Sequence, residues 1–149
     1  MVALERSTTV GRDLADVVAY LADFGHAEEW DAGTKTCTRI DAGPVQVGAR
    51  WRNVSEFRGK ETEIEYTLVR QQPLRLTFTG ENKTVSTTDD LTFEADGGGT
   101  RIRYRAQFDF HGLAKLAGPF VKGSLDKLAD DTIEQLTRVL DKRSSSAGG

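Results

Sequence analysis

The chain has 149 residues, with 20 lysines and arginines against 23 aspartates and glutamates, so its formal net charge is −3. This length suits one domain, and the mildly acidic balance gives no reason to expect nucleic acid as a partner. The single cysteine excludes an intramolecular disulfide, and no segment approaches the ~18 apolar residues of a membrane span. The first residues lack the basic and apolar segments of a signal peptide, so we expect a cytoplasmic protein.

The N-terminal part of the chain predicts a strand, two short helices and a second strand. Residues 2–10 are rich in Thr, Ser and Val, as strands are. A helix is predicted over 13–23, because apolar residues follow an N-capping aspartate at helical spacing. A shorter helix is expected over 26–30, and residues 34–41 are again typical of a strand. The following segment, GPVQVG, is interpreted as a loop.

The next two strands form a hairpin with a tight turn at residues 59–60. If Arg58 pairs with Glu61, then Asn53 faces Tyr66 across the hairpin. On this register the less polar positions of both strands lie on the same side of the sheet, because side chains alternate with a period of two. A third strand continues that inner face.

A second hairpin, which turns at residues 96–99, has the clearest alternation. Its inner positions include Asp89, opposite the small Ala106, and its outer positions place Asp90 opposite Arg105. We interpret the outer charges as a solvated face whose exposed ion pairs each stabilise by only ~0–1 kcal/mol. The alternative is an anion-binding stripe of arginines, which the interleaved acids disfavour.

The apolar period then changes to that of an amphipathic helix. The main helix is predicted over 119–142, since Pro119 is tolerated in a first turn, and residues 144–149 are expected to form a disordered tail. One helix of this length can cover the apolar face of a small sheet. We therefore predict an α+β fold over 1–143, a seven-stranded twisted antiparallel sheet wrapped around the C-terminal helix, with a cavity between them.

Several segments resemble the START-related (SRPBCC) helix-grip superfamily, in its polyketide cyclase/dehydrase and lipid-transport branch. They are YLADF at residues 20–24, Trp30 after the second short helix, the GPVQVG loop, and LTRVLDKR near the end of the long helix. The resemblance spans about residues 2–143 and implies the helix-grip fold. It implies function only broadly, because the branch includes both carriers of hydrophobic ligands and aromatase/cyclases.

Asp89 is the leading candidate for chemistry, because a buried carboxylate without a partner is costly and tends to be protonated. It could serve as a general acid or base or bind a polar ligand group, unless a bulge lets it reach water. Tyr66 and Tyr104 complete a tentative catalytic set, unless their rings pack in the core and their hydroxyls bind backbone carbonyls. The inward-facing residues expected to contact a ligand are Trp51, Asn53, Phe57, Tyr66, Phe78, Asp89, Tyr104, Phe108 and Phe120.

Other reactive side chains give weaker signals. His26 and His111 are isolated from ligand-type residues at metal-binding spacing, so no metal site is expected. Cys37 is interpreted as a small packing residue. Arg39 lies in a strand without clear alternation, so its face stays open; pointing inward, it would meet a carboxylate or enolate. No phosphate-binding or dinucleotide motif is present, and no cofactor is expected.

The sequence favours binding or carriage of a small hydrophobic, aromatic or amphiphilic molecule in the internal cavity. The alternative is an aromatase/cyclase- or dehydratase-type enzyme acting on a polyketide-like substrate, in which Asp89, Tyr66 and Tyr104 would position and protonate enolates. A protein-interaction module is disfavoured by the matched charges of the outer face. The oligomeric state and the identity of the ligand stay open.

Overall fold

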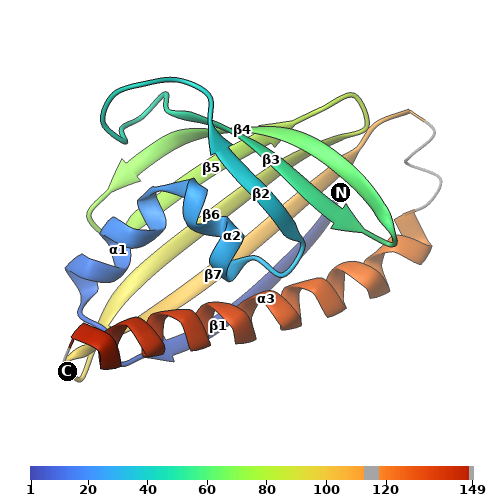
Figure 1. Cartoon of the computed structure of the whole chain (residues 1–149). Helices are drawn as coiled ribbons and strands as arrows, with labels where there is room; N and C mark the ends of the chain where they lie inside the picture. Colours follow the sequence, from blue (N-terminus) through green and yellow to red (C-terminus); the bar gives the residue numbers. More distant parts are fainter. Residues whose placement is uncertain (113–117, 148–149) are drawn as a thin grey trace.

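The computed structural model describes residues 1–112 and 118–147 (Figure 1). Strand β1 (Val2–Val10) is followed by helix α1 (Leu14–Ala22), the short 3-10 helix η1 (Phe24–His26) and helix α2 (Ala27–Trp30). The strands that follow are β2 (Thr34–Arg39), β3 (Arg50–Phe57), β4 (Lys60–Gln72), β5 (Arg75–Glu81), β6 (Val85–Asp96) and β7 (Gly99–Phe110). The long helix α3 (Gly118–Ala147) comes last.

The strands form one antiparallel sheet in the order β1-β7-β6-β5-β4-β3-β2. The sheet curves around α3, while α1 and α2 lie over its concave side next to that helix (Figure 1). A seven-stranded sheet, two short helices after β1 and a long C-terminal helix confirm the predicted helix-grip fold. No helix in the described residues is both long and apolar enough to cross a membrane.

The β3–β4 hairpin turns one residue earlier than predicted. Phe57 pairs with Lys60, so the turn consists of Arg58 and Gly59, with φ angles of 55° and 79°. Positive φ at both central residues gives a two-residue hairpin turn whose twist matches that of the strands. Asn53 consequently pairs with Ile64 and not with Tyr66. The partner strand shifts by an even number of positions, so every side chain keeps its predicted face.

The inner face of the β6–β7 hairpin follows the predicted alternation. Val85, Thr87, Asp89, Leu91 and Phe93 of β6 are all buried, and Asp89 lies opposite Ala106. On the outer face, the strand register alone does not decide which charged side chains bond each other. Asp90 lies opposite Arg105, but its carboxylate accepts hydrogen bonds from Arg75 instead.

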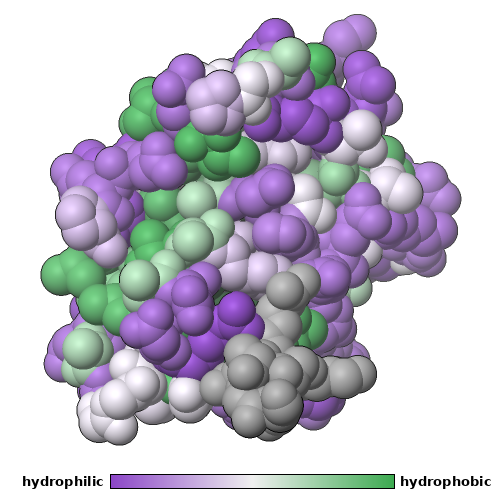
Figure 2. All heavy atoms as spheres, turned by 60° about the vertical axis from the view of Figure 1, so that its left-hand side comes forward, coloured by the Kyte–Doolittle hydropathy of each residue, from purple (hydrophilic) through white to green (hydrophobic). Residues whose placement is uncertain are grey.

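Hydrophilic residues cover much of the face in Figure 2, with hydrophobic ones interspersed among them. The large hydrophobic side chains that the described chain exposes lie in loops, turns or bulges or at strand ends: Met1, Ile40, Val47, Val69 and Leu74. Leu74 is 50% exposed because it lies in the turn between β4 and β5.

Helix α3 lies along β1 and is bonded to it at several points. Arg6 forms ion pairs with Asp126 and Asp130, and the Thr8 and Thr137 hydroxyls share a hydrogen bond of 2.6 Å. The helix extends past residue 142 to Ala147, the last described residue, because Ser and Ala after the apolar positions do not stop a helix as Gly does.

Two clusters of apolar side chains fill the space between the sheet and the helices. We call the first the aromatic core; it lies under α1 and α2 and is centred on Phe24, Trp30, Trp51 and Phe78. We call the second the cavity end; it lies toward the start of α3 and includes Leu4, Phe57, Phe108 and Leu125.

Candidate functional site

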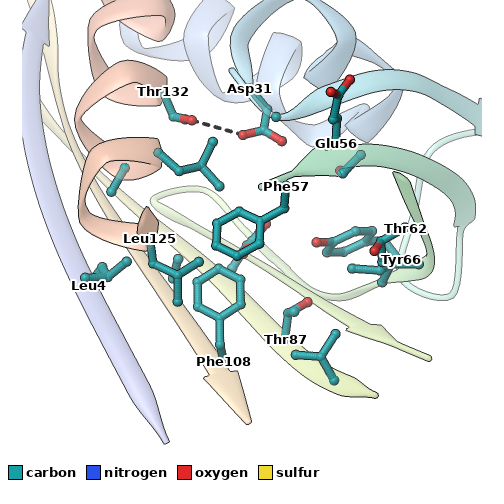
Figure 3. Close-up of a pocket in the computed structure, with 18 of the residues that line it drawn as sticks. Leu4, Asp31, Glu56, Phe57, Thr62, Tyr66, Thr87, Phe108, Leu125 and Thr132 are labelled. Carbon is teal, nitrogen blue, oxygen red and sulfur yellow. Dashed lines mark hydrogen bonds between the residues drawn. The ribbon is translucent and has the colours of Figure 1, made fainter. Parts of the chain in front are cut away.

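A cavity of about 160 Å³, partly open to solvent, lies between the curved sheet and the middle of α3 (Figure 3). Its walls include Leu4 of β1, Phe57 of β3, Phe108 of β7 and Leu125 of α3. Among them stand a few polar groups, which is the usual composition of a small-molecule site. They include Asp31, Tyr66, Thr87, Asp89, Tyr104 and Thr132.

Asp89 and Tyr104 form a buried polar pair on neighbouring strands. Asp89 is only 5% exposed, and its burial, followed by the nearby charge of Asp31, raises its pKa from 3.8 to about 7. The polar interaction with the Tyr104 hydroxyl acts in the opposite direction and lowers the pKa of Asp89. Burial and the charge of Asp89 raise the pKa of Tyr104 well above its ordinary value, so this hydroxyl stays a donor. The pair can therefore hold or exchange a proton near neutral pH.

Asp31, which is not among the site residues predicted from the sequence, belongs to the same site. It follows α2, and its carboxylate accepts hydrogen bonds from the Thr34 hydroxyl and, at 3.0 Å, from the Thr132 hydroxyl of α3 (Figure 3). Asp31 is partly buried and lines the cavity. Burial raises the pKa of its carboxyl group. An Asp followed three residues later by Thr is a turn-forming pattern that points to a local bond. The contact with Thr132 is not local and leaves no signal of this kind.

Tyr66 and Thr87 line the side of the cavity formed by β4 and β6, on either side of Gly80. Gly80 pairs with both residues, and a Cβ atom there would lie 2.7 Å from a ring carbon of Tyr66 and from the Thr87 hydroxyl. The missing side chain thus leaves room for the tyrosine ring over the strand. Figure 3 shows the Tyr66 hydroxyl pointing into the cavity. Burial raises the pKa of Tyr66, so it too remains protonated.

Five of the residues expected to contact a ligand line this cavity: Phe57, Tyr66, Asp89, Tyr104 and Phe108. Trp51 and Phe78 belong to the aromatic core and are fully buried. Asn53 is also buried, and its amide donates a hydrogen bond to the Thr34 hydroxyl at 3.0 Å. It therefore supports Thr34, the residue whose hydroxyl binds Asp31. The side chain of Phe120 lies outside the described residues.

Arg39 lies away from the cavity. Its guanidinium pairs with Asp41 at 2.5 Å and stands over the Trp51 ring at 5.5 Å. Burial raises the pKa of Cys37 to about 12, which keeps the thiol protonated and fits a packing residue.

The two histidines are held by local contacts. The His26 ring stacks on Tyr20, with ring centroids 4.2 Å apart, and the His111 ring bonds the Ser86 hydroxyl at 2.8 Å. Within residues 1–112 and 118–147, no group of His, Cys, Asp and Glu side chains has the arrangement of a metal site.

Comparison with known proteins agrees with this architecture. The Zhui aromatase/cyclase from a Streptomyces species has a TM-score of 0.84 at 13% identity, with 99% of this chain and 98% of that chain covered. A protein from Thermus thermophilus has a TM-score of 0.78 at 15% identity, covering 99% and 100%. A START superfamily protein from Mycobacterium smegmatis has a TM-score of 0.72 at 14% identity, covering 97% and 98%. These similarities show a shared fold.

No curated protein matches the sequence. The family model described as "Polyketide cyclase / dehydrase and lipid transport" matches residues 1–141. The chain therefore belongs to the polyketide cyclase/dehydrase and lipid-transport family.

Proposed function

We propose that the protein binds a small hydrophobic or amphiphilic molecule in the cavity between the sheet and α3. The observation that carries the proposal is the cavity itself, which has mostly apolar walls and a few convergent polar groups. The proposal includes one ligand-binding domain over residues 1–143 and, in view of the single cysteine, a cytoplasmic location.

The size of the cavity limits the ligand. A dry apolar cavity of roughly 150 Å³ holds a molecule such as benzene, and the volume here is about 160 Å³. The ligand portion that enters is therefore one ring or a short branched chain. A polar group on it would be oriented by the buried pair of Asp89 and Tyr104.

Filling the cavity tests this function. Ala129 of α3 lines the cavity, whereas Ala15 of α1 is exposed, so Ala129→Leu and Ala15→Leu make the same change in two settings. We expect small aromatic alcohols to raise the Tm of the wild-type protein and of Ala15→Leu but not that of Ala129→Leu. Circular dichroism checks that both variants fold. A broad panel that leaves the wild-type Tm unchanged at millimolar concentration would contradict the proposal.

A second candidate function is catalysis of the cyclase or dehydratase type. It is favoured by one observation, a carboxyl group with a pKa of about 7 beside a tyrosine hydroxyl inside a largely apolar cavity. Asp89 would remove a proton from the carbon next to a carbonyl, and Tyr104 would donate a hydrogen bond to the resulting enolate oxygen. Arg39, held by Asp41, takes no part.

Asp89→Asn tests this candidate, with Asp96→Asn at the exposed end of β6 as the matched control. We expect Asp89→Asn to abolish conversion of a short poly-β-ketone, followed by the absorbance of the aromatic product, and Asp96→Asn to leave it unchanged. Wild-type turnover by a folded Asp89→Asn protein would remove Asp89 from the mechanism.

A further inference from the structure

The ionisable side chains that line the cavity in the described residues are all acidic. In the part of the chain that the structure describes, the ionisable groups of the wall are Asp31, Glu56, Tyr66, Asp89 and Tyr104, and no Lys, Arg or His is among them. Any bound molecule therefore meets carboxyl groups and phenol hydroxyls. An anionic ligand would meet like charges in a poorly solvated space, which is strongly unfavourable.

Basic side chains near the cavity point elsewhere and have partners. Lys35 pairs with Glu56 at 2.9 Å, where both side chains are about half exposed, so it compensates the rim carboxylate and not the inner ones. Arg6 of β1 pairs with acids of α3 on the solvent side. The described α3 residues on the cavity wall, Leu125, Leu128, Ala129 and Thr132, carry no charge. Asp31 and Asp89 thus lack a cation among the described residues.

The aromatic walls favour the same kind of ligand. Phe57, Tyr66, Tyr104 and Phe108 surround the space, and the negative face of an aromatic ring attracts a cation, most strongly where water is excluded.

A buried acceptor adds an independent observation. Thr87 is 3% exposed and lines the cavity, and its Oγ1 atom has no hydrogen-bond partner of ordinary geometry in the described chain. Its interaction with the Tyr66 hydroxyl lowers the pKa of that group and offsets part of the effect of burial. An ammonium group carries three donors and needs several acceptors when it leaves water. The carboxylates of Asp31 and Asp89 and the hydroxyl of Thr87 provide such a set.

We propose that the cavity selects apolar molecules that carry a protonated amine, over molecules of the same shape that carry a carboxylate or phosphate. The inference rests on the proposed ligand-binding function and names the class of ligand. The ammonium group would lie between the two inner carboxylates, and the apolar body would lie against the phenylalanines.

The ionisation of Asp89 makes this selection depend on pH. Its pKa of about 7 arises from burial and from Asp31, and the tyrosines facing it, Tyr66 and Tyr104, stay protonated. Cys37 of β2 is also protonated, and α3 presents no charged group there. An ammonium ligand requires the ionised form of Asp89, so protons compete with it below pH 7. A neutral ligand has no such requirement.

Three probes with one phenyl ring and a short chain test the proposal: 2-phenylethylamine, 2-phenylethanol and 3-phenylpropanoate. Titration calorimetry at pH 8 in phosphate buffer should give a Kd for the amine at least roughly tenfold lower than for the carboxylate, with the alcohol between them. Lowering the pH to 6 should weaken amine binding severalfold and leave alcohol binding unchanged.

Substitutions of Asp31 and Asp89 test whether these two carboxylates cause the preference for the amine. Asp89→Asn and Asp31→Asn should each bring the amine Kd close to that of the alcohol, while Asp96→Asn on the surface should preserve the wild-type preference. Alcohol binding by each variant shows that its cavity is intact.

The outcomes separate the two proposals. A carboxylate that binds as tightly as the amine overturns the charge preference and leaves ligand binding in place. Failure of all three probes overturns both. An amine preference that survives the combined change of Asp31 and Asp89 to Asn overturns the placement of the ammonium group between them.

Discussion

The aromatic core and the cavity end are built on the same sheet face, yet one is solid and the other hollow. In the aromatic core, Phe24 comes down from η1 onto Phe78 and Tyr66, with ring centroids 4.6 and 4.5 Å apart. At the cavity end no second helix layer is present over the described strands, and Phe57 and Phe108 stay partly exposed. The alternation of a strand thus decides which side chains face inward, and the covering elements decide whether those side chains pack or line a space.

The strongest test of this contrast compares two phenylalanines. Phe78 is fully buried in the aromatic core, so Phe78→Ala should lower the free energy of unfolding by about 3–5 kcal/mol. Phe108 borders a space that already exists, so Phe108→Ala should cost roughly 1–2 kcal/mol. Urea unfolding measures both values. Equal losses would mean that the two ends are packed alike.

The buried carboxyl group should make stability fall as the pH rises. Because the pKa of Asp89 rises from 3.8 to about 7 on folding, the folded protein binds more protons than the unfolded chain between these values. The free energy of unfolding therefore decreases from about pH 4 to pH 7, by at most about 4 kcal/mol from this group. Asp31, whose pKa is also raised, acts in the same direction.

Asp89→Asn should stabilise the protein at pH 8 and have little effect at pH 5, measured by urea unfolding at each pH. Asp96→Asn, at the exposed end of β6, should leave the pH dependence as it is in the wild-type protein. A pH dependence that Asp89→Asn does not reduce would show that Asp89 is ionised in the folded state at low pH.

Gly80→Ala tests how the cavity wall is formed. The added Cβ would meet Tyr66, Thr87 and Ile64 at 2.7 to 2.8 Å, so these side chains must move. We expect a loss of about 1–3 kcal/mol in the free energy of unfolding, as for other overpacked sites, and weaker ligand binding. Gly11→Ala, at a glycine with nothing within 4 Å of the added Cβ, is the control for the backbone effect. Unchanged affinity in Gly80→Ala would place the ligand away from Tyr66.

A further prediction concerns the bond that links α3 to the cavity. Thr132 donates to Asp31 and accepts from the Ala32 amide at 3.2 Å. Thr132→Val keeps the shape and removes both bonds, so it should cost roughly 1–3 kcal/mol, since a buried group loses its partner. Because Asp31 would lose a donor to its ionised form, the loss should be larger at pH 8 than at pH 5. A loss that is equal at both values would indicate that the ionisation of Asp31 does not change between pH 5 and pH 8.

Much of the fold was predictable because alternation with a period of two survives small errors. The β3–β4 register was wrong, yet Tyr66 still faced inward, since the error was an even number of residues. The site was less accessible to prediction. Whether Trp51 packs or lines a cavity depends on where η1 places Phe24, and Asp31 meets Thr132 only across the folded chain. Neither contact follows a repeating pattern that can be recognised in the sequence.

The turn formed by Arg58 and Gly59 gives the protein a means of varying its cavity. Phe57 stands directly before this turn and on the cavity wall. Inserting or deleting two residues on each strand would move the tip of the hairpin along its own axis and keep Phe57 on the inner face of the sheet. The reach of the aromatic wall could thus change in steps during evolution, while the aromatic core behind it stays the same.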